Sequence, residues 1–187
     1  SAKPKAPSVS DPNHPAAPLE TLITQRRETL QRLRDCGIDP YPYHFGPTHT
    51  LTRLQHDFEG PLPEHGSEQV VRAAGRVMTL RDMGKSCFAH LADGPDRLQI
   101  YVKKDVVGEE AYKMFQKDLD LGDFIGVEGP MFRTKTNELT LRVVKWTLLA
   151  KSLRPLPEKF HGLKDVEIRY REREMDLVSN PEIHKLF

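Results

Sequence analysis

The sequence has few cysteines, few aromatic residues and no excess of charge of either sign. The two cysteines, Cys36 and Cys87, form neither a zinc nor a redox spacing, which favours a reducing compartment. Lys and Arg number 28 against 27 Asp and Glu, for a net charge of +1. The basic excess of a strong general nucleic-acid binder is therefore missing, and any RNA binding should depend only modestly on salt.

Long apolar runs and targeting signals are also missing. No apolar run approaches the ~18 residues of a membrane helix, and no signal-peptide pattern opens the chain. These absences predict a cytoplasmic, soluble protein with no membrane partner. The chain begins with Ser1 rather than methionine, which indicates a piece of a longer protein.

Motifs that carry chemistry are scarce. The eight histidines are scattered without an HxxxH or Cys/His pairing, so we interpret them as surface or packing residues. The GKS triplet at residues 84–86 resembles the end of a phosphate-binding loop, but Thr79 stands where the first glycine belongs. The sequence therefore predicts no catalytic residues, no metal site and no cofactor in this chain.

The most regular pattern runs over residues 70–150. Apolar and polar residues alternate in stretches that predict strands, such as Leu98, Ile100 and Val102, and turn residues separate these stretches. Residues 108–119 follow a helical spacing instead. The order of three strands, a helix and two strands predicts a mainly β fold with flanking helices, namely a five-stranded Greek-key barrel of the OB-fold type.

The rest of the chain divides into three parts. Residues 1–18 hold five prolines and predict a disordered leader. Residues 19–69 predict an N-terminal helix over Leu19–Cys36, a short helix carrying Leu51, Leu54 and Phe58, and a linker. Residues 151–187 predict a charged connector.

The N-terminal helix carries arginines on a second stripe, among them Arg27 and Arg34. A charged helix face is usually solvated, and Glu28 lies among these arginines. The alternative is that Arg27 and Arg34 contact RNA phosphates.

Barrels of this type bind unstacked bases by aromatic stacking and a few contacts to base edges. Phe88 on the second strand is the candidate for stacking, and Gln99 on the third carries the donor and acceptor that match a uracil edge. Arg76 can donate to a carbonyl or phosphate, and Glu138 in the last hairpin can accept from a base N–H. Two alternatives stay open. Phe88 could belong to the core, and Gln99, Arg76 and Glu138 could lie on a solvated barrel surface without binding RNA.

Four motifs, GKSCFAHL, RLQIYV, KTNEL and RPLPEKFHGL, together with the run RRETLQRLRDCGIDPYPYHF, closely resemble the N-terminal half of class II lysyl-tRNA synthetases. The resemblance extends from about Thr21 to Asn180. It implies that residues 70–150 form an anticodon-binding domain, in which Phe88 stacks on the middle anticodon uridine, Gln99 and Arg76 hydrogen-bond it, and Glu138 reads the neighbouring base.

The resemblance also implies a parent enzyme that is a homodimer and joins lysine to tRNA(Lys) with ATP and magnesium. Its catalytic domain would follow this segment, so the chain alone should be inactive. As the partner is a tRNA, no binding of DNA is expected. Where the family usually reads RYRQRYLDL, this chain has Glu172 and Glu174, which puts docking of the connector in question. Asn137 replaces the usual hairpin glycine and tolerates positive φ.

Two other functions compete with tRNA reading by a synthetase. One is a free-standing OB-fold module that binds tRNA or single strands without catalysis. The other is a protein-assembly scaffold in which the leader and the first helix hold a partner. Binding to a uridine-rich anticodon stem-loop that weakens without Phe88 or Gln99 would favour the synthetase interpretation.

Overall fold

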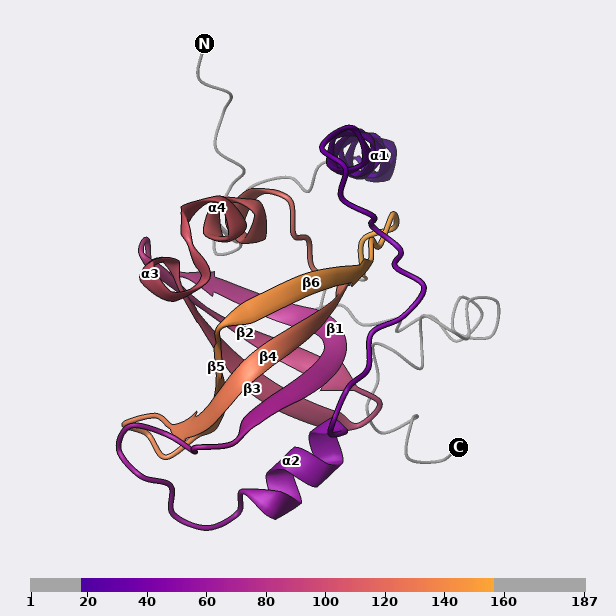
Figure 1. Cartoon of the computed structure of the whole chain (residues 1–187). Coiled ribbons are helices and arrows are strands. Elements are labelled where there is room, and N and C mark those ends of the chain that lie inside the picture. The colour runs from indigo at the N-terminus through magenta and orange to yellow at the C-terminus, as the bar shows by residue number, and fades with distance from the viewer. Residues whose placement is uncertain (1–17, 157–187) are drawn as a thin grey trace.

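The computed structural model describes residues 18–156 (Figure 1). Its elements, in chain order, are α1 (Leu19–Asp35), α2 (Leu51–Asp57), β1 (Val70–Asp82), β2 (Ser86–Asp93), β3 (Asp96–Lys103), α3 (Lys104–Val107), α4 (Glu109–Lys117), β4 (Phe124–Arg133), β5 (Leu139–Val143) and β6 (Lys145–Ala150). The predicted leader up to residue 17 and the connector beyond residue 156, with Glu172 and Glu174, lie outside the described residues.

The strands close into a barrel (Figure 1). They lie in the order β1-β2-β3-β5-β4-β6, and a further pairing of β1 with β4 closes the ring. Every pairing is antiparallel except that of β3 with β5, which is parallel. Inward-facing side chains alternate with outward-facing ones, so Val71, Ala73 and Val77 of β1 are fully buried. The predicted strand and helix order and the OB-fold barrel are confirmed.

The last predicted strand is divided in two at Val144. Leu141 of β5 pairs with Met131 of β4. Lys145 of β6 lies four residues after Leu141, but its partner Glu128 lies only three residues before Met131. This one-residue shift is a β-bulge, which bends the strand and increases its twist. The bend lets β5 pair with β3 while β6 continues along β4.

Helices cover the two ends of the barrel (Figure 1). At one end, α2 buries Leu51 and Leu54 in the core. At the other, α4 buries Tyr112 and Phe115, and the Phe115 ring meets Trp146 edge-on with centroids 5.3 Å apart. Both predicted helices are confirmed, with α4 shorter than the predicted 108–119.

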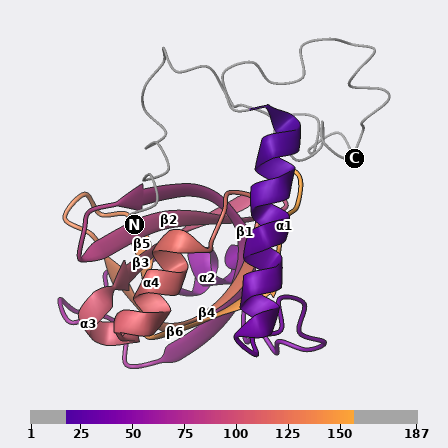
Figure 2. The same ribbon diagram turned by 90° about the horizontal axis from the view of Figure 1, so that it is seen from above.

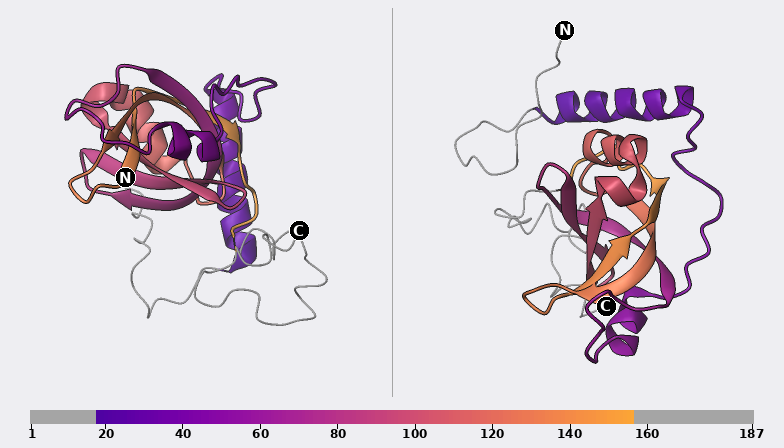
Figure 3. Two further views of the ribbon diagram at one scale, coloured as in Figure 1. Left: turned by 90° about the horizontal axis from the view of Figure 1, so that it is seen from below. Right: turned by 60° about the vertical axis from the view of Figure 1, so that its left-hand side comes forward.

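The helix α1 crosses the barrel end that carries α4 (Figures 2 and 3). Leu30 and Leu33 are buried, as the apolar stripe predicted, but Arg26 is buried as well, with 8% of its surface exposed. Its guanidinium donates to the carbonyl oxygens of Ser152 at 2.9 Å and Leu121 at 3.1 Å. An arginine therefore fastens α1 to the barrel.

A buried ion pair lies beneath this attachment. Lys151 Nζ is 2.6 Å from Asp123 Oδ2, and both side chains are 0% exposed. The Asp123 carboxylate also accepts hydrogen bonds from the backbone N–H groups of Asp120 and Ser152, each at 2.8 Å. Burial raises the pKa of the Asp123 carboxyl, and Lys151 and the two amides oppose that rise. The pair joins the start of β4 to the end of β6.

Candidate nucleic-acid interface

The outer face of β1, β2 and β3 carries a row of polar side chains. Thr79 of β1 lies opposite His90 of β2, which lies opposite Gln99 of β3. A register shift between Val77 and Thr79 changes the alternation of β1 at this point. Thr79 therefore faces outward although it follows the buried Val77 by two positions.

A second row lies beside the first. Arg81 of β1 is opposite Phe88, and Phe88 is opposite Tyr101 of β3. The Phe88 and Tyr101 ring centroids are 4.8 Å apart, with the rings tilted by 39°. Phe88 is only partly buried, because the core positions of β2 are taken by its neighbours Cys87 and Ala89. The interpretation of Phe88 as a core residue is therefore wrong.

Two adjoining open hollows, of about 560 and 610 Å³, lie over these rows. Four residues line both hollows: Thr79, His90, Gln99 and Glu138. The larger hollow is also lined by Phe88 and Arg81 and by the tip of the β4–β5 hairpin at residues 134–136. Strands and a hairpin distant in sequence thus bring Phe88, Gln99 and Glu138 to one surface.

A chain of hydrogen bonds, the Gln99–Glu138–His90 network, crosses this surface. Gln99 Nε2 donates to Glu138 Oε2 at 2.7 Å, and Gln99 Oε1 accepts from the Thr140 hydroxyl at 2.9 Å. His90 Nε2 lies 3.1 Å from Glu138 Oε1, and its Nδ1 lies 2.7 Å from the Thr79 hydroxyl oxygen. The His90 and Glu138 side chains are 35% and 46% exposed, so the network is open to a ligand.

The β4–β5 hairpin holds Glu138 in place. Asn137 has φ 64°, the positive value predicted for it, and its N–H donates to the Thr134 carbonyl at 2.8 Å. Thr134 N–H in turn donates to the Glu138 carbonyl at 3.0 Å.

Arg133, at the base of the hairpin, ties it to the end of α2. Its guanidinium donates to the carbonyl oxygens of Phe58 at 2.9 Å, Glu59 at 2.7 Å and Gly60 at 3.2 Å. It also donates to the Asn137 carbonyl at 3.0 Å, within the hairpin. A single side chain thus links the hairpin to the segment that follows α2.

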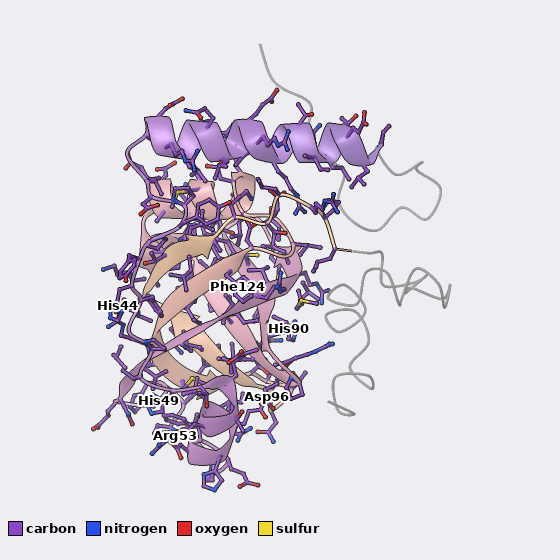
Figure 4. The ribbon with its side chains drawn as sticks, turned by 90° about the vertical axis from the view of Figure 1, so that its right-hand side faces the viewer. His44, His49, Arg53, His90, Asp96 and Phe124 are labelled. Carbon is purple, nitrogen blue, oxygen red and sulfur yellow. The ribbon has the colours of Figure 1, made fainter. Side chains whose placement is uncertain are left out.

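Arg76 faces outward but does not line either hollow. Its guanidinium lies over the Phe124 ring at 4.3 Å and donates to the Gly122 carbonyl at 3.2 Å, and burial lowers its pKa. Figure 4 shows His90 on the barrel wall, with Phe124 nearer to α1. Arg81 is the arginine that lines the larger hollow, and sequence analysis missed it because the register shift between Val77 and Thr79 changes which residues of β1 face outward.

Arg27 and Arg34 are exposed on α1. The helix α1 lies at the barrel end opposite the β4–β5 hairpin, as Figure 3 shows. The structure therefore does not bring them to the two hollows. If Arg27 and Arg34 contact RNA, they contact a different part of the RNA from the part that lies over the two hollows.

The part of the chain that the structure describes holds no group of three or more His, Cys, Asp or Glu side chains placed to bind a metal ion. Among the helices of residues 18–156, none is both long and apolar enough to cross a membrane.

Comparison with known proteins gives the same answer for fold and family. Residues 71–149 match the family described as OB-fold nucleic acid binding domain. Over 169 residues, 90% of this chain, the sequence is 48% identical to the lysine-tRNA ligase of Pelotomaculum thermopropionicum. It is 49% identical over 176 residues to that of Lactococcus lactis subsp. cremoris, and 45% identical over 163 residues to that of Thermosipho melanesiensis.

These matches cover most of this chain but only part of each relative. They span 91% of the chain for the Lactococcus enzyme and 87% for the Thermosipho enzyme, and between 32% and 35% of the three relatives. The chain thus spans about a third of the length of the enzymes that it matches. Its β1 to β6 barrel matches the OB-fold nucleic acid binding domain family, and the chain is similar in sequence to part of the lysine-tRNA ligases.

Proposed function

We propose that this chain reads the anticodon loop of tRNA(Lys) as part of a lysine-tRNA ligase. The observation that carries the proposal is the convergence of Phe88, Gln99 and Glu138 on one open hollow of an OB-fold barrel. An aromatic ring beside amide and carboxylate groups suits a single unstacked base. The similarity to lysine-tRNA ligases indicates that the tRNA bound is tRNA(Lys). The anticodons of this tRNA are rich in uridine, so the base bound would be uracil.

The chemistry of the hollow suits a uracil ring. A base stacked on Phe88 would present its edge to Gln99, whose amide keeps one N–H and one lone pair beyond those used by Glu138 and Thr140. These remaining groups match the O4 acceptor and N3–H donor of uracil. Arg81 supplies positive charge at the same hollow.

Phosphate contacts have a smaller part in the proposal. Residues 70–150 hold 13 basic and 11 acidic side chains, so the barrel itself has little excess positive charge. Arg27 and Arg34 on α1 would contact phosphates away from the base-reading hollow. The salt dependence of binding should accordingly be modest.

The rest of the enzymatic function would belong to the longer protein. That protein would be a homodimeric ligase that uses ATP and magnesium, and this chain would bind neither. A cytoplasmic setting fits the two free thiols of Cys36 and Cys87.

The test is a titration of this chain with two anticodon stem-loops that differ only at the middle base, uridine against cytidine, at one fixed salt concentration. Uridine should be preferred by ~1 to 3 kcal/mol, the usual cost of one mismatched base contact. Equal binding of both loops would contradict base reading. Failure to bind either would contradict the proposal as a whole.

The titration has an internal control for the site. Replacing Gln99 by alanine should remove the preference, whereas replacing Gln116 should not. Gln116 is an amide residue on α4 whose Nε2 donates to Asp82 Oδ1 at 2.9 Å, and it lines neither hollow. A Gln99→Ala variant that keeps the full preference would contradict the assignment of Gln99.

A further inference from the structure

The amide group of Gln99 is held in one of its two orientations. An ionised carboxylate only accepts hydrogen bonds, so the group that faces Glu138 at 2.7 Å must be the NH₂ group. Turning the amide over would place its carbonyl oxygen against the carboxylate, which is repulsive. The hydroxyl of Thr140, at 2.9 Å, can donate or accept and therefore fits either orientation. Glu138 is therefore the residue that determines the orientation of the Gln99 amide.

This orientation matters because uracil and cytosine differ by the same exchange. Uracil presents an N3–H donor beside an O4 acceptor, whereas cytosine presents an N3 acceptor beside an N4 amino donor. For a base stacked in one way on Phe88, an amide in one orientation matches uracil, and the reversed amide matches cytosine. The direction of the Gln99 amide is therefore a choice between the two bases.

His90 supports this arrangement from the neighbouring strand. It contacts the second carboxylate oxygen of Glu138 at 3.1 Å, while its other ring nitrogen lies 2.7 Å from the hydroxyl of Thr79. The Glu138 side chain stands on a hairpin and is 46% exposed, so without His90 it would have more freedom to turn away from Gln99. His90 limits the rotamers that Glu138 can adopt.

We propose that Glu138 and His90 are positioning residues that set the preference for uridine over cytidine by holding the amide of Gln99 in one orientation. The inference rests on the proposed function, and it assigns Glu138 an action through Gln99. His90 receives a role that its sequence pattern did not indicate.

The decisive variant is Glu138→Gln, titrated with the uridine and cytidine stem-loops. A glutamine at this position offers both a donor and an acceptor, so it tolerates either orientation of Gln99. The preference for uridine should fall by about fivefold or more, while affinity for the uridine loop should change far less. Glu110→Gln, an exposed position on α4 with the same change of charge, should leave the preference unchanged.

His90 is tested by rescue. His90→Ala should lower the preference in the same direction, and His90→Gln, whose amide can still donate to Glu138, should restore part of it. Thermal unfolding of each variant checks that the barrel is intact. A His90→Ala variant with the full preference would overturn the role of His90.

The outcomes separate the two proposals. If the unmodified chain binds both loops equally, the proposed function fails. If it prefers uridine and Glu138→Gln keeps the whole preference, only the positioning role is overturned. If Glu138→Gln weakens both loops by the same factor, Glu138 contributes to binding without orienting Gln99, and the inference is again overturned.

Discussion

Two polar clusters of this protein contrast in how much water reaches them. The first joins Arg26, Asp123 and Lys151 where α1 meets the barrel, and the Asp123 and Lys151 side chains are wholly buried. The second is the Gln99–Glu138–His90 network, which is partly exposed on the outer face. In the first cluster protein groups satisfy the charges, whereas the second leaves donors and acceptors free for a ligand.

Because of this difference, the buried cluster should contribute to stability and the exposed network to recognition of a ligand. A buried charge that loses its partner is strongly destabilising, because no water replaces that partner. An exposed charge pair contributes little to stability, since water and salt screen it. Changes in the first cluster should therefore act on unfolding, and changes in the second on RNA binding.

Lys151→Met should give the largest effect. It leaves the Asp123 carboxylate buried without its cation, so the free energy of unfolding should fall by ~3 to 5 kcal/mol in urea denaturation. The double variant Asp123→Asn with Lys151→Met removes the charge as well and should recover part of that loss. A double variant less stable than the single one would contradict this account of the ion pair.

Arg26 and its neighbour Arg27 form a matched pair on α1. Arg26→Gln should lower the free energy of unfolding by ~1 to 3 kcal/mol, because three partly buried carbonyl groups lose their donor. Arg27→Gln, at an exposed position, should change it by less than about 0.5 kcal/mol. Equal effects in thermal or urea unfolding would show that α1 is not fastened through Arg26.

Phe88→Ala should act on binding. It should weaken binding of the uridine-rich stem-loop by ~1 to 3 kcal/mol, the usual worth of one base–aromatic stack. Tyr43→Ala is the control, because Tyr43 is an exposed aromatic residue that lines neither hollow. Calorimetric titration measures both. A loss of affinity in both variants alike would point to a general effect of aromatic residues rather than to the hollow.

The two cysteines should differ in reactivity. Cys36 is exposed and should react at once with a thiol reagent, whereas the buried Cys87 should react only on unfolding. Burial raises the pKa of the Cys87 thiol to about 12, well above about 8.5 for an unfolded chain. The unfolded state therefore releases this proton first, and stability should fall as pH rises from about 8.5 towards 12. Two fast thiols in the native protein would contradict the burial of Cys87.

The barrel could be predicted from the sequence because its alternation is regular. Leu98, Ile100 and Val102 mark an inward face whichever strands pair with theirs. The break at Val144 could not be predicted, because a bulge depends on which residues of β4 lie opposite. Arg26 was missed for a related reason: an arginine in a charged helix is usually solvated, and only the carbonyl groups of a distant loop make its burial favourable.

The candidate site was predicted in part. Phe88 and Gln99 could be placed on one face from their positions in neighbouring strands. Arg81 could not be predicted as a site residue because the register shift after Val77 is invisible in the sequence, and it is this shift that leaves Arg81 opposite Phe88. His90 carried no signal of its own, since its role depends on Glu138, which lies 48 residues away in the chain.

The link made by Arg133 has a consequence for the kinetics of binding. Because the hairpin is already fastened to the segment after α2, the loop that carries Glu138 would not have to become ordered on the proposed binding of RNA. Little conformational entropy is then lost on association. Cutting this link by Arg133→Gln should slow the association of the anticodon loop, since only a fraction of the molecules would present a formed surface at any moment.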